Sequence, residues 1–84
     1  MNKSHQKTLE SIFRRPIPKQ LEWRRIESLF IALGATMIEG AGSRVRFELN
    51  DVIGTFHRPH PQKEAKQYQV HDAREFLQKA GVLP

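Results

Sequence analysis

Basic and imidazole side chains gather in the part of the chain between residues 44 and 66. Arg44 and Arg46 lie two residues apart in an alternating segment, and a later run from His57 to Lys63 reads HRPHPQK. Arginine offers a forked set of donors that matches phosphate oxygens, and histidine readily gives or takes a proton near neutral pH. The types and the spacing of these side chains therefore predict a site that binds a phosphate and moves a proton.

RNA is the substrate that suits such a site. Its ribose carries a nucleophile, the 2′-hydroxyl, so a histidine base and cationic stabilisation of the transition state could cleave the strand without a metal. DNA lacks this hydroxyl and would not support the same mechanism. The candidate catalytic residues are His57 and His60, and the candidate RNA-binding residues are Arg44, Arg46, Arg58, Lys63 and Lys66.

Two other interpretations of the histidines stay open. His57 and His60 could be two ligands of a metal ion, but no third ligand is evident, because the nearby carboxylates are scattered and the chain has no cysteine. Alternatively, both are ordinary polar loop residues. His5 and His71 lie on predicted helices, where we expect neither a catalytic nor a metal-binding role.

A hairpin is predicted to position these side chains. Residues 44–49 alternate polar and apolar, Asn50-Asp51 supplies a turn, and residues 52–57 return as the partner strand. A two-residue turn pairs Leu49 with Val52, Phe47 with Gly54 and Val45 with Phe56 on the covered face. On the open face it pairs Glu48 with Ile53, Arg46 with Thr55 and Arg44 with His57. Gly54 either bulges the strand or allows a close contact.

Helices are predicted on both sides of this hairpin. Helical spacing and end signals indicate helices over about residues 4–14, 22–33 and 70–80, with Ser4 as the first cap and Gly34 and Gly81 as stops. Pro16 and Pro18 separate the first two helices, and a short strand is expected over residues 35–39. Val82 and Leu83 are expected to fold back onto the core. The fold class is therefore α+β.

The length, composition and net charge limit the kinds of protein that this chain can be. Eighty-four residues predict a single domain, with residues 1–20 as an N-terminal helical extension and proline linker and residues 21–84 as the core. No signal peptide or membrane-spanning run is evident, so we expect a cytoplasmic protein. The net charge of +5 indicates a polyanionic partner, although an acidic protein would also complement it. Most of the excess lies in residues 1–34, which hold seven basic and three acidic side chains.

Several short motifs resemble the HicA toxins of bacterial toxin–antitoxin pairs. The resemblance covers about residues 21–83 and rests on the helix–strand–strand–strand–helix order and on four segments: Leu33-Gly34-Ala35, Gly42-Ser43, residues 60–64 (HPQKE) and residues 76–82 (FLQKAGV). It implies an α-β-β-β-α sandwich like the double-stranded RNA-binding domain, here with an extra N-terminal helix. It also implies cleavage of messenger RNA and inhibition by a HicB-like antitoxin. Because the mechanism argued above needs no metal, we expect no cofactor.

The chain departs from this family at one position of the expected site. HicA toxins typically read Gly-Ser-His at the start of the second strand, and that histidine is taken to be catalytic, whereas here Gly42-Ser43 precedes Arg44. The family's later histidine corresponds to His60. Because Arg44 is predicted to lie across from His57, we hypothesise that the imidazole has moved to the neighbouring strand. The alternatives are a non-catalytic RNA-binding module, an inactivated family member kept for protein contact, and a small metal-dependent nuclease.

Overall fold

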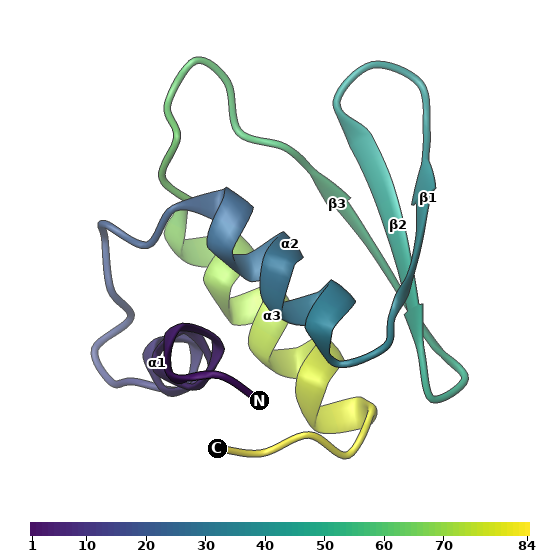
Figure 1. Cartoon of the computed structure of the whole chain (residues 1–84). Helices are drawn as coiled ribbons and strands as arrows, with labels where there is room; N and C mark the ends of the chain where they lie inside the picture. The colour runs from purple at the N-terminus through teal and green to yellow at the C-terminus, as the bar shows by residue number, and fades with distance from the viewer.

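The computed structural model describes all 84 residues and confirms the α+β architecture (Figure 1). Three helices and three strands follow one another in the predicted order. Their bounds are α1 Lys3–Ile12, α2 Trp23–Ala32, β1 Thr36–Glu39, β2 Arg44–Leu49, β3 Val52–His57 and α3 Gln67–Lys79. From α2 to α3 the chain has the predicted order of helix, three strands and helix, and α1 is the extra N-terminal helix.

The strands form one antiparallel sheet in the order β1-β2-β3, and the predicted register of the hairpin is confirmed at every pair. Asn50 and Asp51 turn the chain with φ angles of 51° and 66°. Two consecutive residues with positive φ give the turn whose twist matches that of paired strands, and asparagine and aspartate tolerate this conformation well. The turn therefore fixes which side chains face the open side of the sheet.

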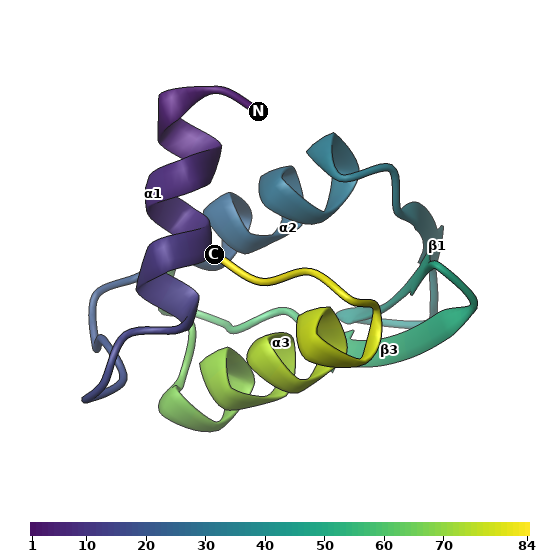
Figure 2. The same cartoon turned by 90° about the horizontal axis from the view of Figure 1, so that it is seen from below.

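The helices all lie on one side of the sheet. Figures 1 and 2 show α2 and α3 running side by side against one face, while α1 crosses them on the side away from the sheet. Phe30 of α2 lies at the centre of this core, with its ring centroid 5.0 Å from Phe47, 5.0 Å from Phe76 and 5.8 Å from Phe56. The opposite face of the sheet has no covering element, and it carries Arg44, Arg46 and His57.

The N-terminal helix belongs to the same core. Leu9 and Ile12 are buried within the main hydrophobic cluster, and the buried Arg74 of α3 donates hydrogen bonds to the carbonyl oxygens of Ile12 (2.9 Å) and Arg14 (3.0 Å). The last carbonyls of a helix lack partners within it, so this arginine satisfies groups that would otherwise be buried unpaired. Arg74 thus joins the end of α1 to α3.

Some predicted helix ends were wrong. Asn2, not Ser4, caps α1, because its Oδ1 accepts the His5 N–H at 2.8 Å, and the helix ends at Ile12. Helix α3 begins at Gln67, three residues before the predicted start. Val82 packs against the core as expected, but Leu83 is 66% exposed and does not.

Gly54 allows a close contact and causes no bulge. A Cβ atom at this position would lie 2.7 Å from Cδ1 of Phe76 and 2.9 Å from Cε2 of Phe56, while the β2–β3 pairing continues through it. We expect Gly54→Ala to destabilise the protein by about 1–3 kcal/mol, because both rings are held in the aromatic core. This exceeds the gain of about 0.4–1 kcal/mol that alanine brings by restricting the unfolded chain. Urea unfolding would measure the difference.

Thr55→Ala is the matched control for this substitution. Thr55 is the next residue of β3 but is exposed on the open face, so its loss is expected to change the free energy of unfolding by less than about 0.5 kcal/mol. Equal stability of Gly54→Ala and wild type would show that the core tolerates the added methyl group.

Candidate functional site

The open face of the sheet carries the predicted pair of Arg44 and His57. Arg44 begins β2 and His57 ends β3, and the two residues are direct cross-strand partners. Side chains at such positions have Cβ atoms about 4.5–5.5 Å apart. Both are exposed, and Arg46 stands two residues along β2 on the same face. The structure therefore brings three of the seven predicted site residues together.

A shallow hollow lies beside this pair. It has a volume of about 330 Å³, and its lining includes Arg44, Arg46, Thr55 and Ile38. Arg46 has a weak partner in Glu48, with Nε 3.6 Å from Oε2, whereas Arg44 takes part in no ion pair. The guanidinium of Arg44 is thus available to an anionic ligand at the edge of the hollow.

A buried glutamine holds the backbone of His57 in place. Gln69 of α3 is 3% exposed, its Nε2 donates to the carbonyl oxygen of His57, and its Oε1 accepts the N–H of Lys66 at 2.9 Å. The N–H of Arg58 also donates to the carbonyl of Ser43 at 2.9 Å. These bonds hold the end of β3 against both β2 and the start of α3, so the backbone position of His57 is set by the fold.

Arg58 lies on the other side of the sheet from His57. Its Nε is 2.7 Å from Oε2 of Glu27 on α2, and its Nη1 is 2.7 Å from Oε1 of Glu39 on β1. These carboxylates raise the pKa of Arg58, and the hydrogen bond from Arg58 lowers the pKa of Glu39 below its usual value. Trp23 also donates its Nε1–H to Glu27. Arg58 therefore ties β1 and β3 to α2, with its donors already occupied.

The loop between β3 and α3 carries the remaining candidates. Its backbone pairs with the start of α2, since the N–H of Trp23 donates to the carbonyl of Lys63 at 2.9 Å and the N–H of Ala65 donates to that of Leu21 at 2.8 Å. Lys63 lines a hollow of about 590 Å³ with Arg24 and other residues, which we call the loop hollow. His60 is exposed in this loop, and Lys66 immediately precedes α3. The predicted cluster thus divides into an open-face group and a loop group.

Two other structural findings concern metal binding and membrane insertion. No group of three or more His, Cys, Asp or Glu side chains is placed so that it could hold a metal ion. No helix is long and apolar enough to span a membrane.

The predictions from sequence missed two residues that matter in this region. Glu27 was not among the candidates, yet its side chain is only 17% exposed and accepts hydrogen bonds from both Arg58 and Trp23. Gln69 is the N3 residue of α3, where glutamine is usual in a capping box, but the N-cap residue Lys66 is not a typical cap, so the helix start was not recognised. The alternation of β3, continued by one residue past His57, does place Arg58 on the covered side and could have indicated its carboxylate partners.

A comparison with protein families gives one match. The family model described as HicA toxin of bacterial toxin–antitoxin matches residues 23–82, which is most of the chain. No curated protein and no solved structure matches the sequence. The matched residues run from the start of α2 past the end of α3 and leave α1 and the proline linker outside.

Proposed function

Because the chain belongs to the HicA family of toxins of bacterial toxin–antitoxin systems, we propose that it is an endoribonuclease that cleaves messenger RNA in the cytoplasm. The proposal includes a metal-independent mechanism and inhibition by a HicB-like antitoxin. The observation that carries it is the pairing of Arg44 with His57 across the open face of the sheet. This pair combines a phosphate-binding group with a group able to move a proton.

In the proposed reaction, His57 acts as the general base. Its imidazole takes the proton of a ribose 2′-hydroxyl, and the 2′-oxygen attacks the adjacent phosphorus. The bond to the 5′-oxygen then breaks, that oxygen takes a proton from water, and a 2′,3′-cyclic phosphate remains. Arg44 binds a non-bridging oxygen and stabilises the charge that develops there, with Arg46 beside it. The step needs no redox or metal cofactor.

The pairing also supports the proposed relocation of the imidazole. The family resemblance puts a histidine at the position of Arg44, and the cross-strand partner of this position is His57. Two cross-strand positions reach nearly the same point above the sheet. An arginine on β2 and a histidine on β3 can therefore bring a phosphate-binding group and a base to this point.

A second candidate function is favoured by the same departure. If Arg44 marks the loss of the catalytic residue, the protein is a non-catalytic RNA-binding module or an inactive toxin kept for protein contact. The open face would then bind RNA phosphates through Arg44 and Arg46 without cleaving the strand. A metal-dependent nuclease is the third alternative.

Incubation of the purified protein with single-stranded RNA in EDTA distinguishes these functions. We expect cleavage to persist in EDTA and to leave 2′,3′-cyclic phosphate and 5′-hydroxyl ends, detected by end-specific labelling and mass spectrometry. RNA that is bound but intact would favour the non-catalytic module. Cleavage that stops on chelation and returns with added Mg²⁺ or Mn²⁺ would contradict the metal-independent mechanism.

The open face also fits the proposed antitoxin. Ile38 and Ile53 are 36% and 61% exposed on this face, on either side of β2. Apolar side chains next to cationic ones suit a protein partner that covers the sheet and carries acidic groups. A HicB-like protein bound here would block Arg44 and His57 at the same time.

A further inference from the structure

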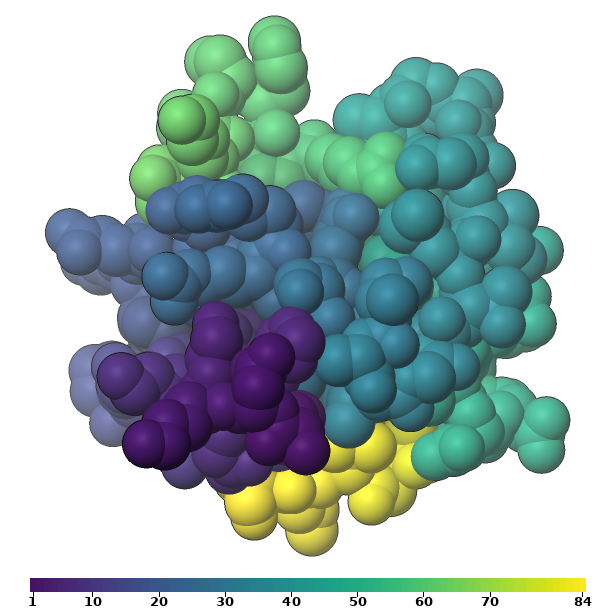
Figure 3. Space-filling model, in the orientation of Figure 1, coloured from purple at the N-terminus to yellow at the C-terminus, as the bar shows by residue number.

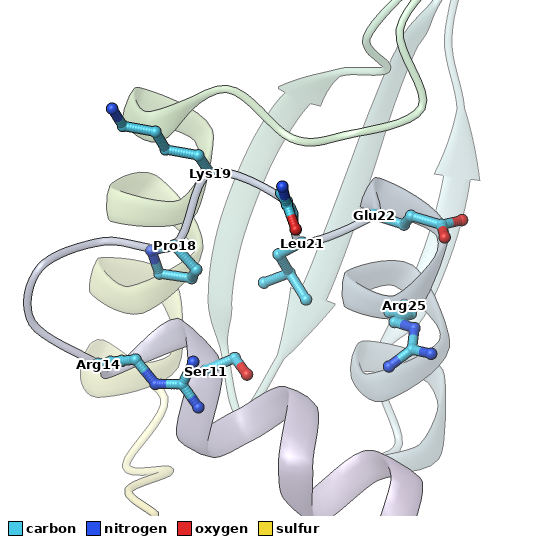
Figure 4. Close-up of a pocket in the computed structure, with 8 residues that line it drawn as sticks. Ser11, Arg14, Pro18, Lys19, Leu21, Glu22 and Arg25 are labelled. Carbon is cyan, nitrogen blue, oxygen red and sulfur yellow. The ribbon is translucent and has the colours of Figure 1, made fainter.

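The N-terminal extension builds a second basic hollow, away from the open face of the sheet. It has a volume of about 510 Å³ between the end of α1, the proline linker and the start of α2, and we call it the linker notch. Its lining includes Arg14, Lys19 and Arg25, which come from three different segments (Figure 4). In Figure 4, Leu21 lies between Arg14 on one side and Arg25 on the other, while the Lys19 side chain extends outward, away from Leu21.

The cations of the linker notch have no carboxylate partners. Arg14, Lys19 and Arg25 form none of the ion pairs in the structure, and all three side chains are exposed. Glu22 is the one acidic residue in the lining, and its Oε1 is 2.7 Å from Nε of Arg24. The hydrogen bond and charge of Arg24 lower the pKa of Glu22, with Arg25 and Lys63 contributing. The notch therefore keeps an uncompensated positive charge.

The walls of the notch suit phosphate better than a protein surface. Leu21 is the only large apolar side chain in the lining, and it is 7% exposed. The centre of a protein–protein interface usually requires exposed aromatic or aliphatic anchors, which this hollow lacks. Arginine side chains on two sides of a polar hollow instead match the separate oxygens of a nucleic-acid backbone.

The notch is continuous with the loop that carries His60 and Lys63. Glu22 lines both the linker notch and the loop hollow, and the backbone around Leu21 and Trp23 pairs with residues 63–65. Figure 3 shows the linker, the start of α2 and this loop on one face of the molecule. An RNA strand that crosses Glu22 could therefore contact both the linker notch and the loop hollow.

We propose that the linker notch is a second RNA-binding site, in which Arg14, Lys19 and Arg25 hold phosphates of a strand that also contacts the loop near Lys63. This inference rests on the proposed function, because it takes RNA as the ligand. It assigns the N-terminal extension a role in holding substrate. The contacts are electrostatic, so they add affinity without reading the base sequence.

The test measures binding of a fluorescent single-stranded 2′-O-methyl RNA, which lacks the nucleophile and stays intact. The variant R14Q/K19Q/R25Q is compared with the control K3Q/K7Q/K79Q, which removes three exposed lysines outside the notch and has the same net charge. We expect the notch variant to bind about tenfold or more weakly. We also expect the slope of log K against log salt to fall by about 2, at about 0.7 per phosphate contact. The control should lose less than about threefold, as distant charges are screened.

A variant that should bind the RNA more tightly provides an independent test. Glu22→Gln removes the acid between the two hollows and frees Arg24, and the Glu22 side chain makes no capping bond to α2. This variant should bind the RNA a few-fold more tightly. Equal losses in the notch and control variants, or no gain with Glu22→Gln, would overturn the second site. If the wild-type protein itself fails to bind RNA, the proposed function fails as well, so the two failures are distinguishable.

Discussion

His57→Ala is expected to slow RNA cleavage by about 10²–10⁴-fold, the usual contribution of a positioned general base. The substitution removes the imidazole that faces Arg44 and leaves the backbone bonds of residue 57 in place, including the one that its carbonyl accepts from Gln69. His57 is exposed, so the fold should not change. Single-turnover cleavage of a labelled RNA measures the rate, and growth arrest on expression gives a cellular readout.

Two other histidines provide the controls. His71→Ala on α3 should leave the rate unchanged, because this exposed side chain lies near Asp72 and Glu75 and away from the open face. His60→Ala tests the second candidate, which the family resemblance favours. The relocation of the base to β3 is wrong if His57→Ala cleaves RNA at the wild-type rate, whatever the effect of His60→Ala. Binding of 2′-O-methyl RNA should stay within about twofold in His57→Ala, since arginines carry most of the phosphate contact.

The register of the hairpin was predictable because three independent signals agree. The alternation over Arg44–Leu49 defines the buried face, Asn50 and Asp51 tolerate positive φ, and a slip by one residue would bury charges. The position of His57 across from Arg44 follows directly from that register. Local patterns thus fixed the part of the site that lies within regular strands.

The loop part of the site was not predictable in the same way. Past His57 no periodic pattern continues, and the course of the chain depends on contacts with distant segments. Arg58 turns to Glu27 and Glu39, which are 31 and 19 residues away in sequence. The backbone of the loop pairs with residues 21–23 of another segment. Local alternation gives at most the side of the sheet on which Arg58 lies, whereas the course of the loop depends on these long-range partners. A group of basic residues close in sequence is therefore divided in the structure between the open face and the loop.

The start of α3 shows the same limit on a smaller scale. Lys66 is not a typical cap residue, so apolar spacing alone set the predicted start at Val70. In the structure, the side-chain oxygen of Gln69 accepts the Lys66 N–H. The Gln69 side chain is buried, and its Nε2 donates to the carbonyl oxygen of His57. The helix therefore begins where a tertiary contact supports it. That contact also joins the helix to the strand that carries the proposed base.

Ile12→Ala is expected to lower the free energy of unfolding by about 2–5 kcal/mol, the usual cost of truncating a buried isoleucine. Ile12 is fully buried at the end of α1, and its carbonyl accepts a hydrogen bond from the buried Arg74. Native domains are stable by only about 5–15 kcal/mol, so this loss would remove a large share of the total. Urea unfolding followed by circular dichroism and by Trp23 fluorescence measures it.

Ile31→Ala is the matched control, because it makes the same change on a helix where the side chain is 48% exposed, and it should cost less than about 1 kcal/mol. Trp23 lies in α2 and is buried against Phe56, so its fluorescence reports on the core covered by the family match. If α1 is part of one cooperative core, Ile12→Ala shifts the fluorescence and circular dichroism transitions together. A fluorescence transition that stays at the wild-type midpoint would instead show that α1 unfolds separately, and the linker notch would then depend on a helix that the toxin core does not need.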